Sequence, residues 1–132
     1  MQFFLLYLTT LTVFAVLDAA GLTFVMKPLF QRHLGDLLLS PINLAPAVGF
    51  YLFYIAGLVW LVSMPALRDG SVGQAALNGA ILGALAYGTY EFTNMSTLRG
   101  WDWTMVAVDT SWGTLLTACS AAAGVWAVRL MA

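Results

Sequence analysis

Charged side chains are scarce in this sequence. Five Lys and Arg and six Asp and Glu make up only 8% of its 132 residues, whereas 61% are hydrophobic. A soluble domain of this size carries roughly 25% charged residues. The composition therefore excludes an ordinary water-soluble domain and is typical of a chain solvated by lipid. The net charge of −1 and the lack of a basic block exclude the usual footprint of a nucleic-acid-binding protein, so we expect no nucleic acid as a partner.

Cysteine and histidine are nearly absent, which excludes several kinds of site. A lone cysteine, Cys119, allows no internal disulfide. A lone histidine, His33, allows neither a multi-histidine metal site nor bis-histidine haem ligation within one chain. The sequence also has no glycine-x-serine-x-glycine nucleophile motif and no phosphate-binding loop. We therefore predict no metal site, leave the cofactor unknown and do not favour an enzyme.

Long apolar runs are what the sequence has in abundance. Each of four runs is long enough to cross about 30 Å of hydrocarbon at 1.5 Å per residue. Bare backbone cannot stay unpaired in lipid, and the alternation of a small barrel is missing, so the runs are expected to be helices. We predict an all-α membrane protein, a four-transmembrane-helix bundle, in which a single domain (residues 1–132) has spans at about 3–26, 44–64, 72–95 and 103–131.

Prolines and capping residues set the predicted ends of these spans. Pro28 ends the first span and Pro65 closes the second, because proline cannot continue a helix interior. Asn43 is placed to cap the start of the second span. Ser71 followed by Gln74 has the spacing of a capping box for the third span.

A short segment between the first two spans has a different pattern. In residues 28–40 the apolar side chains share one helical face and the polar ones share the other. We predict a short amphipathic helix lying in the headgroup layer, with an ordinary polar loop as the alternative. The apolar face comprises Leu29, Phe30, Leu34, Leu37 and Leu38, and the polar face comprises Gln31, Arg32 and Asp36.

Small residues recur at four-residue spacing in the last two predicted spans. They include Gly79 and Gly83 in the third span and Gly113 in the fourth. Such rows let helix backbones approach closely. The close contact is expected either between the third and fourth spans or between chains, in a homodimer or a larger membrane complex.

Three carboxylates, Asp18, Glu91 and Asp109, fall inside the predicted spans. Each costs a few kcal/mol to place in a bilayer, so the side chains are expected to face the interior and to have partners. Counted along the helices, Asp18 lies roughly 12 Å from the loop end of its span, and the other two lie roughly 6–9 Å from theirs. An even number of spans puts these ends on one side, so the three acids occupy one leaflet.

Other polar groups fall at the same level. Tyr87 and Asn94 share a helical face with Glu91, and Trp112 shares a face with Asp109, by their three- and four-residue spacing. These residues, with Asp18, are our candidates for a ligand-binding or proton-carrying pocket.

Basic residues at the span ends supply candidate counter-ions and leave the orientation open. Lys27 and Arg99 stand at helix ends from which they can reach inward to the acids. With Arg32 they put three basic residues on the side of the first and third loops, against Arg68 and Arg129 on the side of the termini. Three basic residues on one side against two on the other are too close in number for the positive-inside rule to give the orientation.

The chain resembles a bacterial family of predicted membrane proteins, domain-of-unknown-function family 2177. The resemblance is carried by YGTYEFTN at residues 87–94, TLRGW at 97–101, VD at 108–109 and WGT at 112–114, and extends to Asp18 and to the FYLFYIAG segment of the second span. The chain departs from the family in having Glu91 where Asp is more frequent and Gly21 where a Trp is common. The resemblance implies four spans and a multi-pass place in the bacterial inner (cytoplasmic) membrane, and supplies no activity.

Three classes of function fit these observations. We favour a small binding or transport module whose acid-lined pocket holds a cation, a proton or a polar lipid head group in one leaflet. The first alternative is an accessory subunit or assembly factor of a larger membrane complex, since the small-residue rows suit helix contacts. The second is a membrane-embedded lipid-modifying enzyme with one acid as general base and another as general acid. The carboxylates are the single feature of the sequence that supports this alternative. The acids also fit a purely structural role in setting helix register. In every case the lipid bilayer is a partner.

Overall fold

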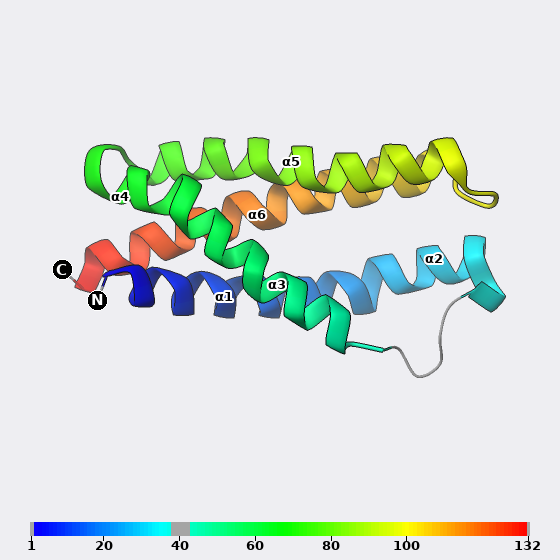
Figure 1. The fold of residues 1–132 in the computed structure, drawn as a ribbon, viewed down its shortest axis with the longest axis horizontal. Helices are drawn as coiled ribbons and strands as arrows, with labels where there is room; N and C mark the ends of the chain where they lie inside the picture. Colours follow the sequence, from blue (N-terminus) through cyan, green and yellow to red (C-terminus); the bar gives the residue numbers. More distant parts are fainter. Residues whose placement is uncertain (1, 38–42, 132) are drawn as a thin grey trace.

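The computed structural model describes residues 2–37 and 43–131, and within these residues it contains helices and turns and no strand (Figure 1). The helices form four long runs, two of which contain a π-helical turn. The elements are α1 (Gln2–Gly21), η1 (Leu22–Met26), α2 (Lys27–Leu34), η2 (Gly35–Leu37), α3 (Ala45–Leu58), η3 (Val59–Ser63), α4 (Met64–Asp69), α5 (Val72–Thr97) and α6 (Trp103–Met131).

The first helix, α5 and α6 run roughly along one another, with the most extensive contacts between α5 and α6 and between α1 and α6. Figure 1 shows that α1 begins and α6 ends at one end of the molecule, whereas the turn from α5 to α6 and the far end of α2 lie at the other. The run of α3 and α4 crosses the others obliquely. Three runs are long and apolar enough to cross a membrane: Gln2–Leu34, Ala45–Asp69 and Trp103–Met131. Within the described residues these three are therefore candidate membrane spans by length and composition, and the predicted number of four spans is not confirmed.

The predicted end of the first span at Pro28 is wrong, because the helix continues to Leu34. The turn of π-helix η1 lies immediately before Lys27, whose N–H bonds to the carbonyl of Leu22, five residues back. A proline in an ordinary α-helix lacks one N–H donor and clashes with the carbonyl four residues earlier. The wider turn relieves this conflict, as local π adjustments do in membrane helices.

A π-helical turn also precedes Pro65, and the second helix continues past this proline. The predicted end of the second helix at Pro65 is therefore also wrong. The turn η3 directly precedes Met64, whose N–H bonds to the carbonyl of Val59, again five residues back. The helix then continues as α4 to Asp69. At the start of this run the side chain of Asn43 accepts a long bond of 3.4 Å from the N–H of Ala45.

The segment predicted as an amphipathic interfacial helix joins the first helix instead of starting a new one. Residues 28–34 form most of α2, and the helix then tightens into η2. Residues 38–40 of the predicted helix lie outside the described residues. A separate helix in the headgroup layer is therefore not confirmed. Leu29 of α2 is buried against Trp101, and Phe30 packs beside it.

The third and fourth helices follow the sequence closely. Ser71 caps α5 as predicted, its hydroxyl accepting a 3.1 Å bond from the N–H of Gln74. The helix α6 runs from Trp103 to Met131, within the predicted bounds, after Asp102 has capped its first turn. α5 has 26 residues, and the structure does not place it among the three runs that are long and apolar enough to span.

The row of small residues on α5 packs against α6 within the chain. The contact between α5 and α6 is the most extensive one between helices. A Cβ added at Gly79 would lie 3.1 Å from the carbonyl oxygen of Thr117, and one at Gly83 would lie 2.5 Å from that of Gly113. The two backbones therefore touch where side chains are missing, as small-residue contacts between membrane helices do.

Substitution of these glycines tests the contact. Gly83→Ala is expected to lower the free energy of unfolding by about 1–3 kcal/mol, because the new methyl group forces two backbones apart. The matched control is Gly88→Ala on the same helix, where the nearest atom to the new methyl lies 3.8 Å away. That change is expected to be neutral or to stabilise by up to about 1 kcal/mol. Unfolding in mixed micelles, followed by circular dichroism, measures both; equal losses would contradict the close contact.

Candidate functional site

Three buried carboxylates come from three different helices. Asp18 on α1 is 5% exposed, Glu91 on α5 is fully buried and Asp109 on α6 is 8% exposed. Asp18 lies opposite Trp112, and Trp112 follows Asp109 by three residues on α6. Asp18 therefore sits about one helical turn deeper than Asp109, which is the relative depth expected from the sequence.

The carboxyl groups of Glu91 and Asp109 face each other across the contact between α5 and α6. Oε1 of Glu91 accepts a 2.8 Å hydrogen bond from the indole Nε1 of Trp101. Oε2 of Glu91 is buried and accepts no hydrogen bond from an N–H group or a hydroxyl of the described residues. Two facing carboxylates repel one another unless a proton or a cation lies between them.

Asp18 has its own set of neighbours. The side chains of Tyr51 on α3 and Trp112 on α6 lie beside its carboxyl group, and Asp109 is close enough to interact with it electrostatically. Trp112 reaches this position because residue 21 is a glycine: a Cβ there would lie 2.7 Å from Nε1 of the indole. This Nε1 is buried beside the carboxyl group of Asp18.

The other predicted site residues are divided between the cluster and its surroundings. The ring of Tyr87 packs against Gly113, where no side chain intervenes, and lies close enough to Asp18 and Asp109 to interact with both. Asn94 lies beside Tyr90, which is half-exposed. The structure thus brings together five of the six candidates and leaves Asn94 outside, with Glu91 linking the others to Trp101. The five are Asp18, Tyr87, Glu91, Asp109 and Trp112.

The predicted counter-ions do not reach the acids. Lys27 and Arg99 are exposed. Among residues 2–37 and 43–131, the single contact of this kind between a basic and an acidic side chain joins His33 and Asp102, with 2.9 Å between Nε2 and Oδ2. The buried acids therefore have no cationic side chain of the described chain beside them.

Trp101 and its neighbours cover Glu91 from the loop side. The Trp101 ring is 8% exposed and makes edge contacts with Phe30 and Tyr90, with centroids 5.4 and 5.9 Å apart. Tyr51 and Trp101 were not among the predicted site residues. The sequence signals for Trp101 are its place in the TLRGW segment of the family resemblance and the short turn after α5, which brings residue 101 back over the last turns of that helix.

The contact between His33 and Asp102 holds together the two segments on either side of Trp101. Nδ1 of His33 contacts the carbonyl of Leu29 at 2.9 Å while Nε2 contacts Asp102. Asp102 also accepts backbone bonds from Thr104 and Met105 at the start of α6. The Met105 bond, followed by the His33 contact, lowers the pKa of Asp102 below its ordinary value. The far end of the first helix is thus tied to the start of the last one.

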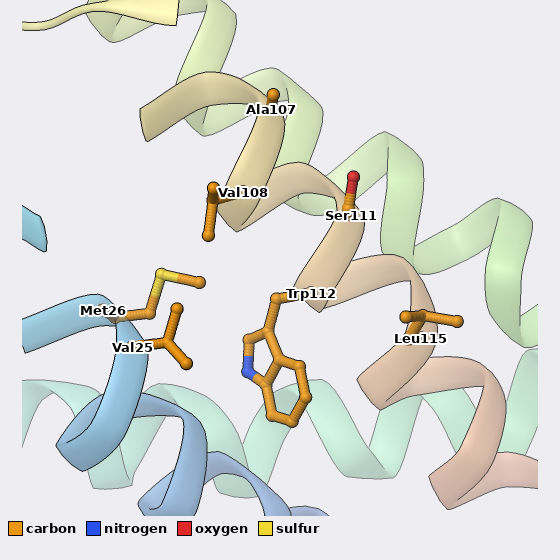
Figure 2. Close-up of a pocket in the computed structure, with 7 residues that line it drawn as sticks. All are labelled: Val25, Met26, Ala107, Val108, Ser111, Trp112 and Leu115. Carbon is orange, nitrogen blue, oxygen red and sulfur yellow. The ribbon is translucent and has the colours of Figure 1, made fainter. Parts of the chain in front are cut away.

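An apolar groove opens beside the acid cluster, between η1 and α6. Its volume is about 430 Å³. Figure 2 shows Trp112 extending from α6 toward the helix that carries Val25 and Met26, so its indole forms part of the groove wall. The lining residues are Val25, Met26, Ala107, Val108, Ser111, Trp112 and Leu115. In the described part of the chain, no three His, Cys, Asp or Glu residues are grouped so as to hold a metal ion.

Removal of the Asp102 carboxylate tests the contribution of its contacts with His33 and with the start of α6. Because the folded state lowers the pKa of Asp102, its contribution to stability is present at neutral pH and is lost as the pH falls through the folded pKa. Asp102→Asn is therefore expected to lower the free energy of unfolding at neutral pH, and the deficit is expected to vanish as the pH falls below about 4. The control is Asp36→Asn, an exposed acid. A pH-independent deficit would contradict this assignment.

Comparison with known proteins identifies a family but no activity. No curated protein and no solved structure matches the chain significantly. A family model described as a predicted membrane protein matches residues 3–126, which is nearly the whole chain and includes all three buried acids. The chain therefore belongs to the predicted membrane protein family DUF2177.

Proposed function

We propose that this protein is a small binding or transport module that holds a proton or a monovalent cation at Asp18, Glu91 and Asp109. The observation that carries the proposal is the buried pair of facing carboxyl groups, Glu91 and Asp109, in which Oε2 of Glu91 accepts no hydrogen bond from an N–H group or a hydroxyl of the described residues. A carboxylate inside a membrane domain is costly and is retained where it has a partner or a task. The described chain offers these acids no basic side chain, so a bound proton or a small cation is the proposed partner.

The arrangement of the acids supports movement of the ion as well as its binding. Glu91 faces Asp109, and Asp109 lies close to Asp18 one turn deeper. Tyr51 and Tyr87 add hydroxyl groups around the same space. A proton passing from Glu91 to Asp18 would thus always have an oxygen acceptor nearby.

The membrane topology is part of the proposal. We place α5 as the fourth span, for three reasons: its 26 residues cover roughly 39 Å, it lies along α6, and its outer face exposes Leu77, Ile81 and Leu85. Four crossings put both termini on one side and give a multi-pass protein. The bacterial inner membrane is the proposed location, since helices are the spanning elements of that membrane.

Reconstituted liposomes test the proposal. Wild-type protein is expected to admit protons when a pH gradient is imposed in the presence of a potassium ionophore, as followed by an enclosed pH-sensitive dye. Asp18→Asn, Glu91→Gln and Asp109→Asn are each expected to reduce this flux to that of protein-free liposomes. Asp36→Asn, which alters an exposed acid outside the cluster, is expected to keep the wild-type rate.

Infrared difference spectra at two pH values separate binding from transport. Protonation of a buried carboxyl gives a C=O stretch that is expected in the wild type and is expected to weaken in each acid variant. If the spectra and the flux of folded variants equal those of the wild type, the proposal fails. If all three variants lose their helical fold, the acids serve helix register and the proposal also fails.

A further inference from the structure

The groove beside Trp112 adds a second, independent observation to the acid cluster. Its walls are apolar apart from Ser111, and it opens on the outer surface between the first helix and α6. A volume of about 430 Å³ falls in the range of small-molecule sites. Since the outer surface of this bundle faces lipid, the groove is open to molecules dissolved in the bilayer rather than to water.

Trp112 connects the groove to the acids. One face of its indole lines the groove, as Figure 2 shows, while its Nε1 edge lies against Gly21. Gly21 follows Asp18 by three residues, so both lie on one face of α1. The buried Nε1 lies beside the carboxyl group of Asp18. A molecule in the groove therefore lies one side chain away from the carboxyl group of Asp18.

The charge of the acid cluster and the low polarity of the groove together define the class of ligand that the site can bind. The cluster contains three acids and no cationic side chain of the described chain, so it selects positive charge. The groove selects an apolar group. Lipid already solvates an apolar tail, so the groove adds position rather than burial energy: it holds the tail where the attached charge meets the acids.

We propose that the site takes a lipophilic organic cation, with its apolar part in the groove and its cationic head at Asp18. This inference rests on the proposed function and narrows its cation to one class. The ligand enters sideways from the bilayer, passes the edge of Trp112, and displaces a proton from the acids. An anionic or uncharged amphiphile of the same length lacks the attraction that holds the head in place.

Filling the groove separates its role from that of the acids. Labelled octyltrimethylammonium is measured on protein in lipid nanodiscs by equilibrium dialysis, as binding in excess of that to empty nanodiscs. Ala107→Phe places a ring in the groove and is expected to weaken this binding about tenfold or more, by overpacking. Ser111→Leu fills the same groove and serves as a second variant. Ala15→Phe, at an exposed position that does not line the groove, is expected to leave binding unchanged.

The outcomes distinguish this inference from the proposed function. Support requires that Asp18→Asn abolishes octyltrimethylammonium binding, that both groove variants weaken it, and that neither groove variant alters the proton flux. If the groove variants bind as the wild type does, or if no octyltrimethylammonium binds although proton flux depends on the acids, the inference is overturned and the proposed function stands. If neither flux nor binding depends on the acids, both are overturned.

Discussion

The contact between α5 and α6 positions the rest of this protein. Gly79 and Gly83 bring the two backbones together, and the touching carbonyl groups of Gly113 and Thr117 leave no room for a methyl group. This closeness places Glu91 opposite Asp109, because both lie on the faces that the glycines define. It also makes the turn after α5 short enough to return Trp101 onto Glu91. The acid pair is thus a consequence of missing side chains elsewhere on the same helices.

The other two runs adapt to this pair through their π-helical turns. In each run the turn immediately precedes a lysine–proline or methionine–proline step. η1 follows Asp18 closely on the first helix, and Met26 at its end is buried and lines the groove. The wide turns remove the clash that would end the helices. They extend the first helix to the level of the turn before α6, where His33 meets Asp102.

Much of the candidate site could be anticipated because it depends on local geometry. Apolar runs longer than a bilayer is thick predict helices, and residue counts along a helix predict the depth of Asp18 relative to Asp109. Tyr51 and Trp101 could not be found in this way, since their approach to the acids depends on how α3 and the turn after α5 pack. The helix ends predicted at Pro28 and Pro65 were wrong for a related reason. A proline ends a helix only where no change in the neighbouring turn removes its clash with the preceding carbonyl group.

The sequence by itself determined that the chain is a helical membrane protein with costly acids on three of its helices. Composition and apolar length decide this, since lipid tolerates no unpaired backbone and few charges. Tertiary structure alone decided which groups meet: Glu91 with Asp109, Trp112 with Gly21, and His33 with Asp102. Side-chain partners on different helices depend on helix rotation and crossing, and these follow from packing between helices rather than from the pattern along any one of them.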